Sequence, residues 1–326
     1  MTSIFPIVAG GEGAELVSFS RRRLLSCLTA TGLLAACHRT QSQDILRVGS
    51  QKGGTKALML SSGALDGIGY RIEWSEFPAA QNLLEAIGSG AVDVGLVGDA
   101  PFQFAYQSGL PIKAVSAQRT LTRPSEAVTL LVPAGSAVRT VADLKGKRIA
   151  TTRGSIGYYL ALRALHEASI PADAVRFTWL SPGDTRAAFA SHQVDAWACW
   201  TPYASTAIKE GARVVADGQK LIWGYAFEVA NEQAIADRKA LLADFLRREA
   251  KALDWAATHQ AEYARTLAAE TGLPPDIALV MVEKNGRRSV PIDQRVIEDQ
   301  NVVLKTFADA GEIRTDRPLE KAFSVI

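Results

Sequence analysis

Two glycine turns carry the residues whose types and spacing point to chemistry in this chain. The first, with the sequence QKGGT, spans residues 51–55 and follows the apolar run Ile45–Gly49. A turn that leads from a strand into a helix presents free backbone N–H groups, which bind anions. The turn matches neither a P-loop nor a GxGxxG pattern, so it does not indicate a nucleotide. The candidate contacts to a small oxyanion are Gln51, Lys52, Gly53 and Thr55.

The second turn belongs to a weak internal repeat. Arg47, Lys52 and Gly53 correspond to Arg148, Arg153 and Gly154 in the segment RIATTRGS. The repeat continues further along both halves, where an AVDV segment at 91–94 matches QVDA at 193–196. Two units with the same order of strand, turn and helix predict two similar α/β lobes with a ligand cleft between them. The candidate contacts from the second turn are Gly154 and Ser155.

Both turns also allow simpler interpretations. Lys52 and Arg153 suit the attraction of an anion, but Lys and Arg side chains are most often simply solvated. The glycine, threonine and serine residues equally suit ordinary helix capping. These alternatives remain open from the residues alone.

The elements that must position these turns follow from apolar patterns. A chain of 326 residues with 48% hydrophobic and 21% charged residues is long enough for two lobes with their own cores. The apolar run 127–132 predicts the strand that leaves the first lobe, and 222–229 predicts the strand that returns. We therefore expect lobe one at 45–130 plus 223–326 and lobe two at 131–222. Residues 239–257 predict an amphipathic helix.

The N-terminal residues 1–36 have the pattern of an export signal. The SRRRLL sequence at 20–25 resembles the twin-arginine motif, and the weakly apolar run after it is too short to span a bilayer. The LAAC sequence that ends at Cys37 resembles a lipoprotein cleavage site, which predicts a lipid on Cys37 and a tether at 37–44. A plain cleavage site with an incidental cysteine is the alternative. Cys199 would then be the one remaining cysteine, so no internal disulfide is expected.

The order and spacing of short motifs resemble a known family, the aliphatic-sulfonate-binding periplasmic proteins of ABC importers. The wider group includes taurine, nitrate and thiamine-precursor binders. The motifs are QKG at 51–53, EFPA at 76–79, LLEA at 83–86, GDAP at 98–101, SEA at 125–127, VADLKGK at 141–147, GS at 154–155, DTRAAF at 184–189 and VDAW at 194–197. The resemblance implies a two-lobe periplasmic-binding-protein fold of type II, in which each lobe is a mixed α/β sheet flanked by helices and a two-strand hinge joins the lobes. It also implies capture of an aliphatic or aryl sulfonate for a permease, without catalysis or a cofactor.

The resemblance and the local sequence suggest further site residues. Gly98 and Asp99 suit a helix start, although Asp99 would repel a sulfonate and would instead suit a ligand amine or a backbone N–H. Ser125 and Glu126 lie at the predicted hinge entrance, where an exposed loop boundary is the alternative. Asp184 and Arg186 follow a Pro-Gly turn that faces the cleft in the family, unless the two pair with each other. The predicted apolar wall for a ligand tail consists of Trp200, Tyr203 and Phe227, whereas the predicted core tryptophans are Trp179 and Trp197.

No pattern of catalytic residues is evident. The four histidines lie far apart without ligand spacing, and HExxH, GxSxG and CxxC motifs are absent from the sequence. Cys199 lies between Ala198 and Trp200, which favours a buried apolar role. A formal net charge of +2 does not indicate a nucleic-acid partner. The alternatives to sulfonate import are a receptor for nitrate, taurine or a thiamine-pyrimidine precursor, and a ligand-sensing lipoprotein.

Overall fold

The computed structural model describes residues 44–52, 54–122 and 127–326. Residues Ile45–Ile326 form one compact unit. The predicted export signal, the lipidation site at Cys37 and the candidate contacts Gly53, Ser125 and Glu126 lie outside the described residues. Within the described part of the chain, no helix is long and apolar enough to cross a membrane.

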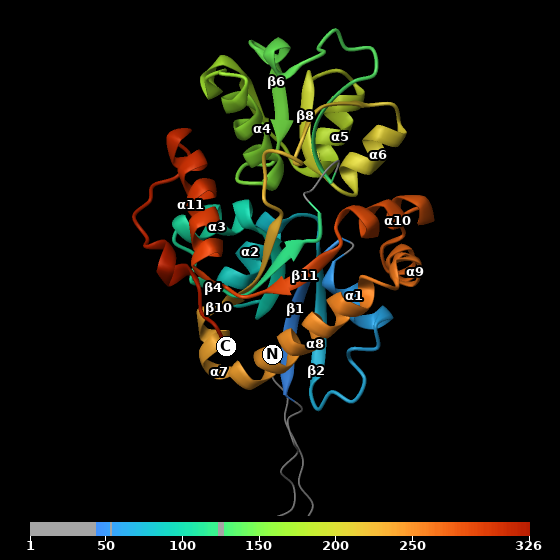
Figure 1. Cartoon of the computed structure of the whole chain (residues 1–326), viewed down its shortest axis with the longest axis vertical. Helices are drawn as coiled ribbons and strands as arrows, with labels where there is room; N and C mark the ends of the chain where they lie inside the picture. The colour runs from blue at the N-terminus through green and yellow to red at the C-terminus, as the bar shows by residue number, and fades with distance from the viewer. Residues whose placement is uncertain (1–43, 53, 123–126) are drawn as a thin grey trace, which may run out of the picture. The chain divides into compact units, whose positions relative to one another are not determined.

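The first lobe is built on a six-stranded mixed sheet in the order β11-β4-β10-β3-β1-β2 (Figure 1). β1 pairs in parallel with β2 and β3, whereas β10 runs antiparallel to both β3 and β4. Its strands are β1 (Ile45–Gln51), β2 (Arg71–Phe77), β3 (Val94–Gly98), β4 (Ile112–Thr120), β10 (Tyr225–Asn231) and β11 (Arg287–Val290).

The second lobe is built on a five-stranded sheet in the order β7-β6-β8-β5-β9. Here β6 pairs in parallel with β7 and β8, and β5 runs antiparallel to β8 and β9. β6, β7 and β8 therefore repeat the arrangement of β1, β2 and β3, as the internal repeat predicted. The strands are β5 (Val128–Val132), β6 (Arg148–Thr151), β7 (Arg176–Trp179), β8 (Ala196–Trp200) and β9 (Arg213–Asp217).

Helices cover both faces of each sheet. In lobe one, α2 and α3 pack on one face of the sheet, and α1 and α8 pack on the other. In lobe two, α4 packs opposite to α5 and α6. The α-helices are α1 (Thr55–Ser61), α2 (Ala80–Gly88), α3 (Asp99–Gln107), α4 (Ile156–Glu167), α5 (Pro182–Ala190), α6 (Tyr203–Lys209), α7 (Glu232–Asp237), α8 (Lys239–Ala256), α9 (Gln260–Thr271), α10 (Pro275–Lys284) and α11 (Gln294–Asp309). The 3₁₀ helices are η1 (Val141–Leu144), η2 (Ala172–Ala174) and η3 (Leu319–Ala322).

An arginine–aspartate ion pair recurs at the same point of both lobes. The backbone N–H of Arg47 at the start of β1 donates to the Asp93 carboxylate at 2.8 Å, and its guanidinium binds the same carboxylate. Arg148 at the start of β6 makes the same contacts with Asp195. The repeat read from the sequence thus corresponds to a repeated structural joint between parallel strands.

The strand predicted to leave lobe one lies wholly in lobe two. β5 pairs with β8 and β9, so the predicted boundary at residue 130 falls inside a strand of the second sheet. The segments that connect the lobes are those between β4 and β5 and between β9 and β10. An apolar run marks a buried strand, but it does not reveal which sheet the strand joins.

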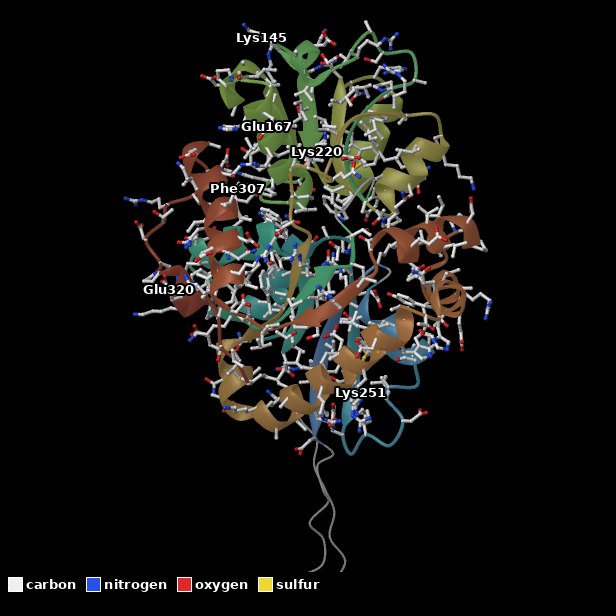
Figure 2. The ribbon with its side chains drawn as sticks, in the orientation of Figure 1. Lys145, Glu167, Lys220, Lys251, Phe307 and Glu320 are labelled. Carbon is white, nitrogen blue, oxygen red and sulfur yellow. The ribbon has the colours of Figure 1, made fainter. Side chains whose placement is uncertain are left out.

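Helix α11 belongs to the C-terminal part of the chain and contacts both lobes. Phe307 on α11 packs edge-on against Phe104 of α3 at 5.6 Å between ring centroids, and it lies 5.7 Å from the Tyr158 ring of α4 (Figure 2). Glu312, just after α11, accepts hydrogen bonds from Arg153 and Tyr158 of lobe two. These contacts tie the second lobe to the C-terminal helix on one side of the molecule.

Candidate functional site

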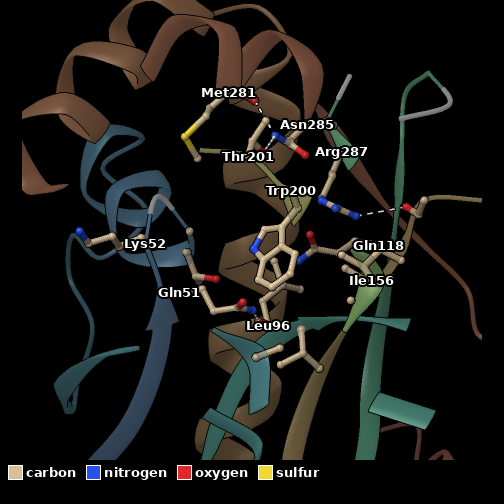
Figure 3. Close-up of a pocket in the computed structure, with 18 of the residues that line it drawn as sticks. Gln51, Lys52, Leu96, Gln118, Ile156, Trp200, Thr201, Met281, Asn285 and Arg287 are labelled. Carbon is tan, nitrogen blue, oxygen red and sulfur yellow. Dashed lines mark hydrogen bonds between the residues drawn. The ribbon is translucent and has the colours of Figure 1, made fainter. Parts of the chain in front are cut away.

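A cavity of about 230 Å³ lies between the two lobes (Figure 3). Its walls combine the turn before α1, the ends of β3 and β4, the start of α4, the end of β8 and residues of α8, α9 and α10. Apolar side chains supply much of the lining, among them Leu58, Trp200, Leu253 and Met281. Such a mixture of apolar walls and a few polar groups is typical of a small-molecule site.

The cavity brings together half of the residues predicted as ligand contacts. The predicted residues that line it are Gln51, Lys52, Thr55, Gly98, Ser155, Trp200 and Tyr203. The described residues predicted as contacts but absent from its lining are Asp99, Gly154, Asp184 and Arg186.

The first glycine turn offers fewer free donors than its sequence predicts. The Gly54 N–H donates to the Gln51 carbonyl at 2.7 Å, which closes the turn on itself. The Gln51 carboxamide donates to the Leu96 carbonyl at 2.7 Å and is therefore fixed in the cavity wall. Lys52 is exposed, and Figure 3 shows its side chain pointing away from Trp200. Thr55 is buried, and its hydroxyl has no hydrogen-bond partner within the part of the chain that the structure describes.

The second turn ends at Ser155, whose side chain caps the start of α4. The Ser155 hydroxyl accepts the Tyr158 N–H at 3.1 Å, so the capping interpretation holds for this residue. The first N–H groups of a helix have no acceptor within it, and Ile156 at the start of α4 lines the cavity. Gly154 has φ +68° and lies against the Phe104 ring rather than in the cavity. Its predicted role as a direct contact is therefore replaced by a role in joining the lobes.

Asp184 and Arg186 lie on the exposed side of α5. The Asp184 carboxylate accepts from Ser181, the residue that caps α5, and Arg186 pairs with Glu210 rather than with Asp184. Helix α5 presents Pro182, Thr185 and Phe189 to the core, so the two charged residues between them face outward. The family pattern placed this turn at the cleft, but the periodicity of α5 directs both side chains to the surface.

Burial corrects two further predictions, whereas the backbone N–H partner suggested for Asp99 agrees with the structure. Phe227 is fully buried within lobe one against Phe102 and does not form part of the cavity wall. Trp179 was expected in the core, but it is 40% exposed and stacks on Phe177, whereas Trp197 is buried as predicted. Asp99 is buried beside the start of α3, where its carboxylate accepts the Ala100 N–H and burial raises its pKa to about 6.

The aromatic pair predicted as a wall is present. The Trp200 and Tyr203 rings meet edge-on at 6.0 Å between centroids, and both line the cavity. The Tyr203 hydroxyl donates to the Pro78 carbonyl of the opposite lobe at 3.0 Å. The wall therefore also forms a contact between the lobes.

Three polar residues of the lining were not predicted from the sequence. The Arg287 guanidinium donates to the Gly224 carbonyl at 3.2 Å, and burial lowers its pKa. Asn285 donates to the Thr201 hydroxyl of lobe two at 2.9 Å. Gln118 is 1% exposed, and both polar atoms of its carboxamide have no hydrogen-bond partner among the described residues.

A buried glutamate also lines the cavity. Glu249 of α8 is 2% exposed, and it lies on the stripe of that helix that buries Leu242, Phe245 and Leu253. Its neighbour Glu228 is fully buried on β10, a strand in which every residue is buried. An acid on the apolar stripe of a helix, or within an apolar strand, was the signal in the sequence that could have identified both.

The described histidines and Cys199 lie away from the cavity lining. Of the described histidines, His166, His192 and His259 are all exposed. Cys199 is 1% exposed in the core of lobe two, and burial raises the pKa of its thiol, which keeps it protonated. Among residues 44–52, 54–122 and 127–326, no group of three or more metal-ligating side chains is present.

Comparison with known proteins identifies relatives of both lobes. A model of the family described as NMT1/THI5 like matches residues 71–263. A protein of Escherichia coli (strain K12), named as an aliphatic sulfonates-binding protein, is 35% identical over 290 residues, which cover 86% of this chain and 90% of that protein. The structure of the alkanesulfonate-binding protein SsuA from Xanthomonas axonopodis pv. citri bound to MOPS has a TM-score of 0.79 and 32% identity, over 86% of this chain and 98% of that chain.

A second solved structure agrees with the first. The periplasmic aliphatic sulphonate binding protein SsuA from Escherichia coli has a TM-score of 0.75 and 30% identity, again over 86% of this chain and 98% of that chain. The predicted α/β fold, with two lobes that are each a mixed sheet flanked by helices, is confirmed.

Proposed function

Because the chain belongs to the NMT1/THI5-like family, we propose that it is the solute-binding component of an ABC importer and captures an aliphatic or aryl sulfonate between its lobes. The observation that carries the proposal is the cavity itself, which joins an apolar wall to polar groups from both lobes. Relatives that cover most of the chain are named for sulfonate binding, which supports the same class of ligand.

The lining suits a molecule with an anionic head and an apolar tail. Arg287 offers a planar set of N–H donors for an oxyanion, and the start of α4 adds backbone donors from the other lobe. Trp200, Leu253 and Met281 provide apolar surface for a tail. A volume of about 230 Å³ favours a small sulfonate over a large aromatic one.

Capture is proposed to involve closure of the lobes. The Tyr203–Pro78, Asn285–Thr201 and Gln81–Arg153 hydrogen bonds all join one lobe to the other. A ligand that contacts both lobes favours the state in which these bonds form, because only that state supplies all of its partners. The two connecting segments between the sheets would act as the hinge, and the closed form would be presented to a permease.

We propose binding without chemical turnover and without a cofactor. This proposal is supported by the named functions of the sulfonate-binding relatives. Neither the buried, protonated Cys199 thiol nor the exposed described histidines line the cavity.

The protein is further proposed to act in the periplasm, attached to a membrane by a lipid on Cys37. Periplasmic location is supported by the Escherichia coli relative, whereas the anchor rests on the LAAC sequence alone. In cells that express the full chain, Cys37→Ala should move the protein from the membrane fraction to the soluble periplasm. A wild-type protein that is entirely soluble would contradict the anchor. Replacement of Arg21 and Arg22 by Lys should block export if the twin-arginine interpretation is right.

The ligand class is tested by calorimetric titration of the purified protein. We expect methanesulfonate, hexanesulfonate and benzenesulfonate to bind, and each to raise the melting temperature because only the folded state binds them. Nitrate, taurine and a thiamine-pyrimidine precursor serve as competitors from the wider group. Binding of nitrate or of the pyrimidine precursor in place of every sulfonate would overturn the proposed ligand class, whereas binding of taurine alone would narrow the class to aminosulfonates.

A further inference from the structure

Four buried polar side chains meet beside the cavity. Glu228 of β10 and Glu249 of α8 face each other, and Thr55 of α1 and Gln118 of β4 complete the group. All four are at most 2% exposed. Three of them, Thr55, Gln118 and Glu249, also line the cavity, so the group forms part of the wall that meets a ligand.

Glu228 and Glu249 can form a hydrogen bond with each other only when the pair holds a proton. Among the described residues, both oxygens of Glu228 and one of Glu249 have no hydrogen-bond partner, and neither carboxyl can donate to the other while both are ionised. Two facing carboxylates in an apolar surrounding also repel each other strongly. A proton on either group turns the contact between Glu228 and Glu249 into a hydrogen bond, so the pair shares at least one proton.

The positive charges of the neighbouring described residues do not neutralise the Glu228 and Glu249 carboxyls. Among the ion pairs of the described residues, none includes Glu228 or Glu249. On the neighbouring elements, α9 contributes the buried Tyr263, β11 contributes Arg287 and α3 contributes Asp99, which interacts electrostatically with Arg287. Lys56 of α1 forms an ion pair with Glu270 of α9, and Arg119 of β4 lies over the Tyr225 ring.

Since no cation among the described residues pairs with the two carboxyls, we take their charge state to depend on protons and on the ligand. Burial raises the pKa of Glu228 well above its usual range and that of Glu249 to about 7. The pair therefore loses its first proton near neutral pH, as a unit rather than as two separate residues.

We propose that Glu228 and Glu249 form a proton-binding site of the ligand pocket and that an anionic sulfonate is captured with both carboxyls protonated. This inference rests on the proposed function and adds to it the charge state in which the pocket accepts its ligand. A negative charge on the pair would lie in the same low-dielectric cavity as the sulfonate and would oppose its binding. In the protonated state, the pair presents hydrogen-bond donors instead of a charge.

Binding of an anion is thereby linked to proton uptake. If the sulfonate binds only when both carboxyls are protonated, the apparent affinity falls in proportion to the fraction of protein in that state. For a group that titrates near pH 7, this fraction drops about tenfold between pH 6 and pH 8. We expect the affinity for hexanesulfonate, which remains a monoanion throughout this range, to fall by about the same factor.

The first experiment uses the unmodified protein. Hexanesulfonate is titrated by calorimetry at pH 6, 7 and 8, and at pH 7.5 in bis-tris and in Tris, two buffers that are not sulfonates and differ in ionisation enthalpy. We expect the affinity to weaken about tenfold from pH 6 to pH 8. The binding heat should also differ between the two buffers, in the sense of proton uptake. Constant affinity together with buffer-independent heat would overturn the inference while leaving sulfonate binding intact.

The second experiment identifies the group that titrates. Glu249→Gln keeps the size and a hydrogen-bond donor but cannot lose a proton, so its affinity should be nearly constant from pH 6 to pH 8. Glu262→Gln, at an exposed position on α9, serves as the matched control and should keep the wild-type dependence. Persistence of the full pH dependence in a folded Glu249→Gln protein would contradict the assignment. Failure of every sulfonate to bind, even at pH 6, would instead refute the proposed function itself.

Discussion

Gly154 and Phe104 are in direct contact across the two lobes. A Cβ atom added to Gly154 would lie 2.6 Å from Cγ of the Phe104 ring, and the backbone of Gly154 has φ +68°. Both the close approach and the left-handed conformation require glycine. The glycine predicted as a ligand contact is thus the point where the second lobe meets α3.

Gly154→Ala is expected to destabilise the protein through two effects. The left-handed conformation costs about 1–2 kcal/mol for a residue with a Cβ. The clash with Phe104 adds to this loss and should also weaken sulfonate binding by disturbing the closed arrangement. Gly146→Ala, at φ +75° with nothing within 4 Å of the added Cβ, is the control for strain alone. Equal melting temperatures for the two variants would argue against the clash, whereas Phe104→Ala should partly rescue Gly154→Ala.

Trp200→Ala should discriminate between long and short sulfonates. Removal of the indole takes apolar contact away from the tail, and each buried CH₂ contributes about 0.8 kcal/mol. We expect about tenfold weaker binding of hexanesulfonate, and methanesulfonate affinity within about twofold of wild type. Trp179→Ala is the matched control because Trp179 is 40% exposed and does not line the cavity. Calorimetric titration of both ligands measures the effect, and an equal loss for both would contradict a tail-binding wall.

Arg287 is expected to matter more than Arg186 for the anionic head. Arg287→Gln should weaken binding of every sulfonate by at least about tenfold, roughly 1.4 kcal/mol, because it removes the charged donor in the cavity. Arg186→Gln should leave affinity unchanged, since that side chain pairs with Glu210 at the surface. Titration of both variants with methanesulfonate is the measurement. The opposite order would show that the head group lies near α5, as the family pattern suggested.

The repeated ion pair provides a matched comparison of stability. Asp93 is 1% exposed and binds Arg47 and Arg238, whereas Asp195 is 31% exposed and binds Arg148. Asp93→Ala should therefore lower the free energy of unfolding by about 2–4 kcal/mol, because it removes a buried acceptor that the partly exposed Arg47 and Arg238 share. Asp195→Ala should lower it by about 1 kcal/mol, because its surroundings are more solvated. Urea denaturation tests the order, and equal losses would contradict the role of burial.

The ligand-free protein should lose stability as the pH rises from about 5 to 8. Burial raises the pKa of Glu249 to about 7, so the folded state binds this proton more tightly than the unfolded chain does. The resulting stabilisation is complete below the unfolded pKa, near 4.3, and disappears as the pH rises through 7. We expect a fall of about 2–3 kcal/mol in the free energy of unfolding, measured by urea denaturation. Glu249→Gln should reduce this dependence and leave the part that comes from Asp99, whose pKa burial raises to about 6. A wild-type curve that rises over the same range would contradict the prediction.

Elements with strong patterns were predictable from the sequence. The repeat of Arg47 and Arg148 with their partners Asp93 and Asp195 anticipated two lobes with equivalent strands. The amphipathic pattern of 239–257 anticipated α8, which ends one residue earlier. Periodicity and turn residues act over a few neighbouring positions, so the sequence records them directly.

The cavity required the tertiary structure for a different reason. Glu228, Gln118 and Arg287 come from β10, β4 and β11, and nothing local marks them as neighbours. The same holds for Gly154, whose partner Phe104 lies on α3 in the other lobe.

By itself, the sequence determined the class of this protein: two related α/β lobes with glycine turns at equivalent points. Only the tertiary structure decided which side chains meet in the cavity between them. It turned Asp184 and Arg186 outward, set Gly154 against Phe104 and buried Glu228 beside Glu249. The physical reason is that helix and strand formation depend on neighbours along the chain, whereas a cavity depends on strand order and on how helices pack across sheets.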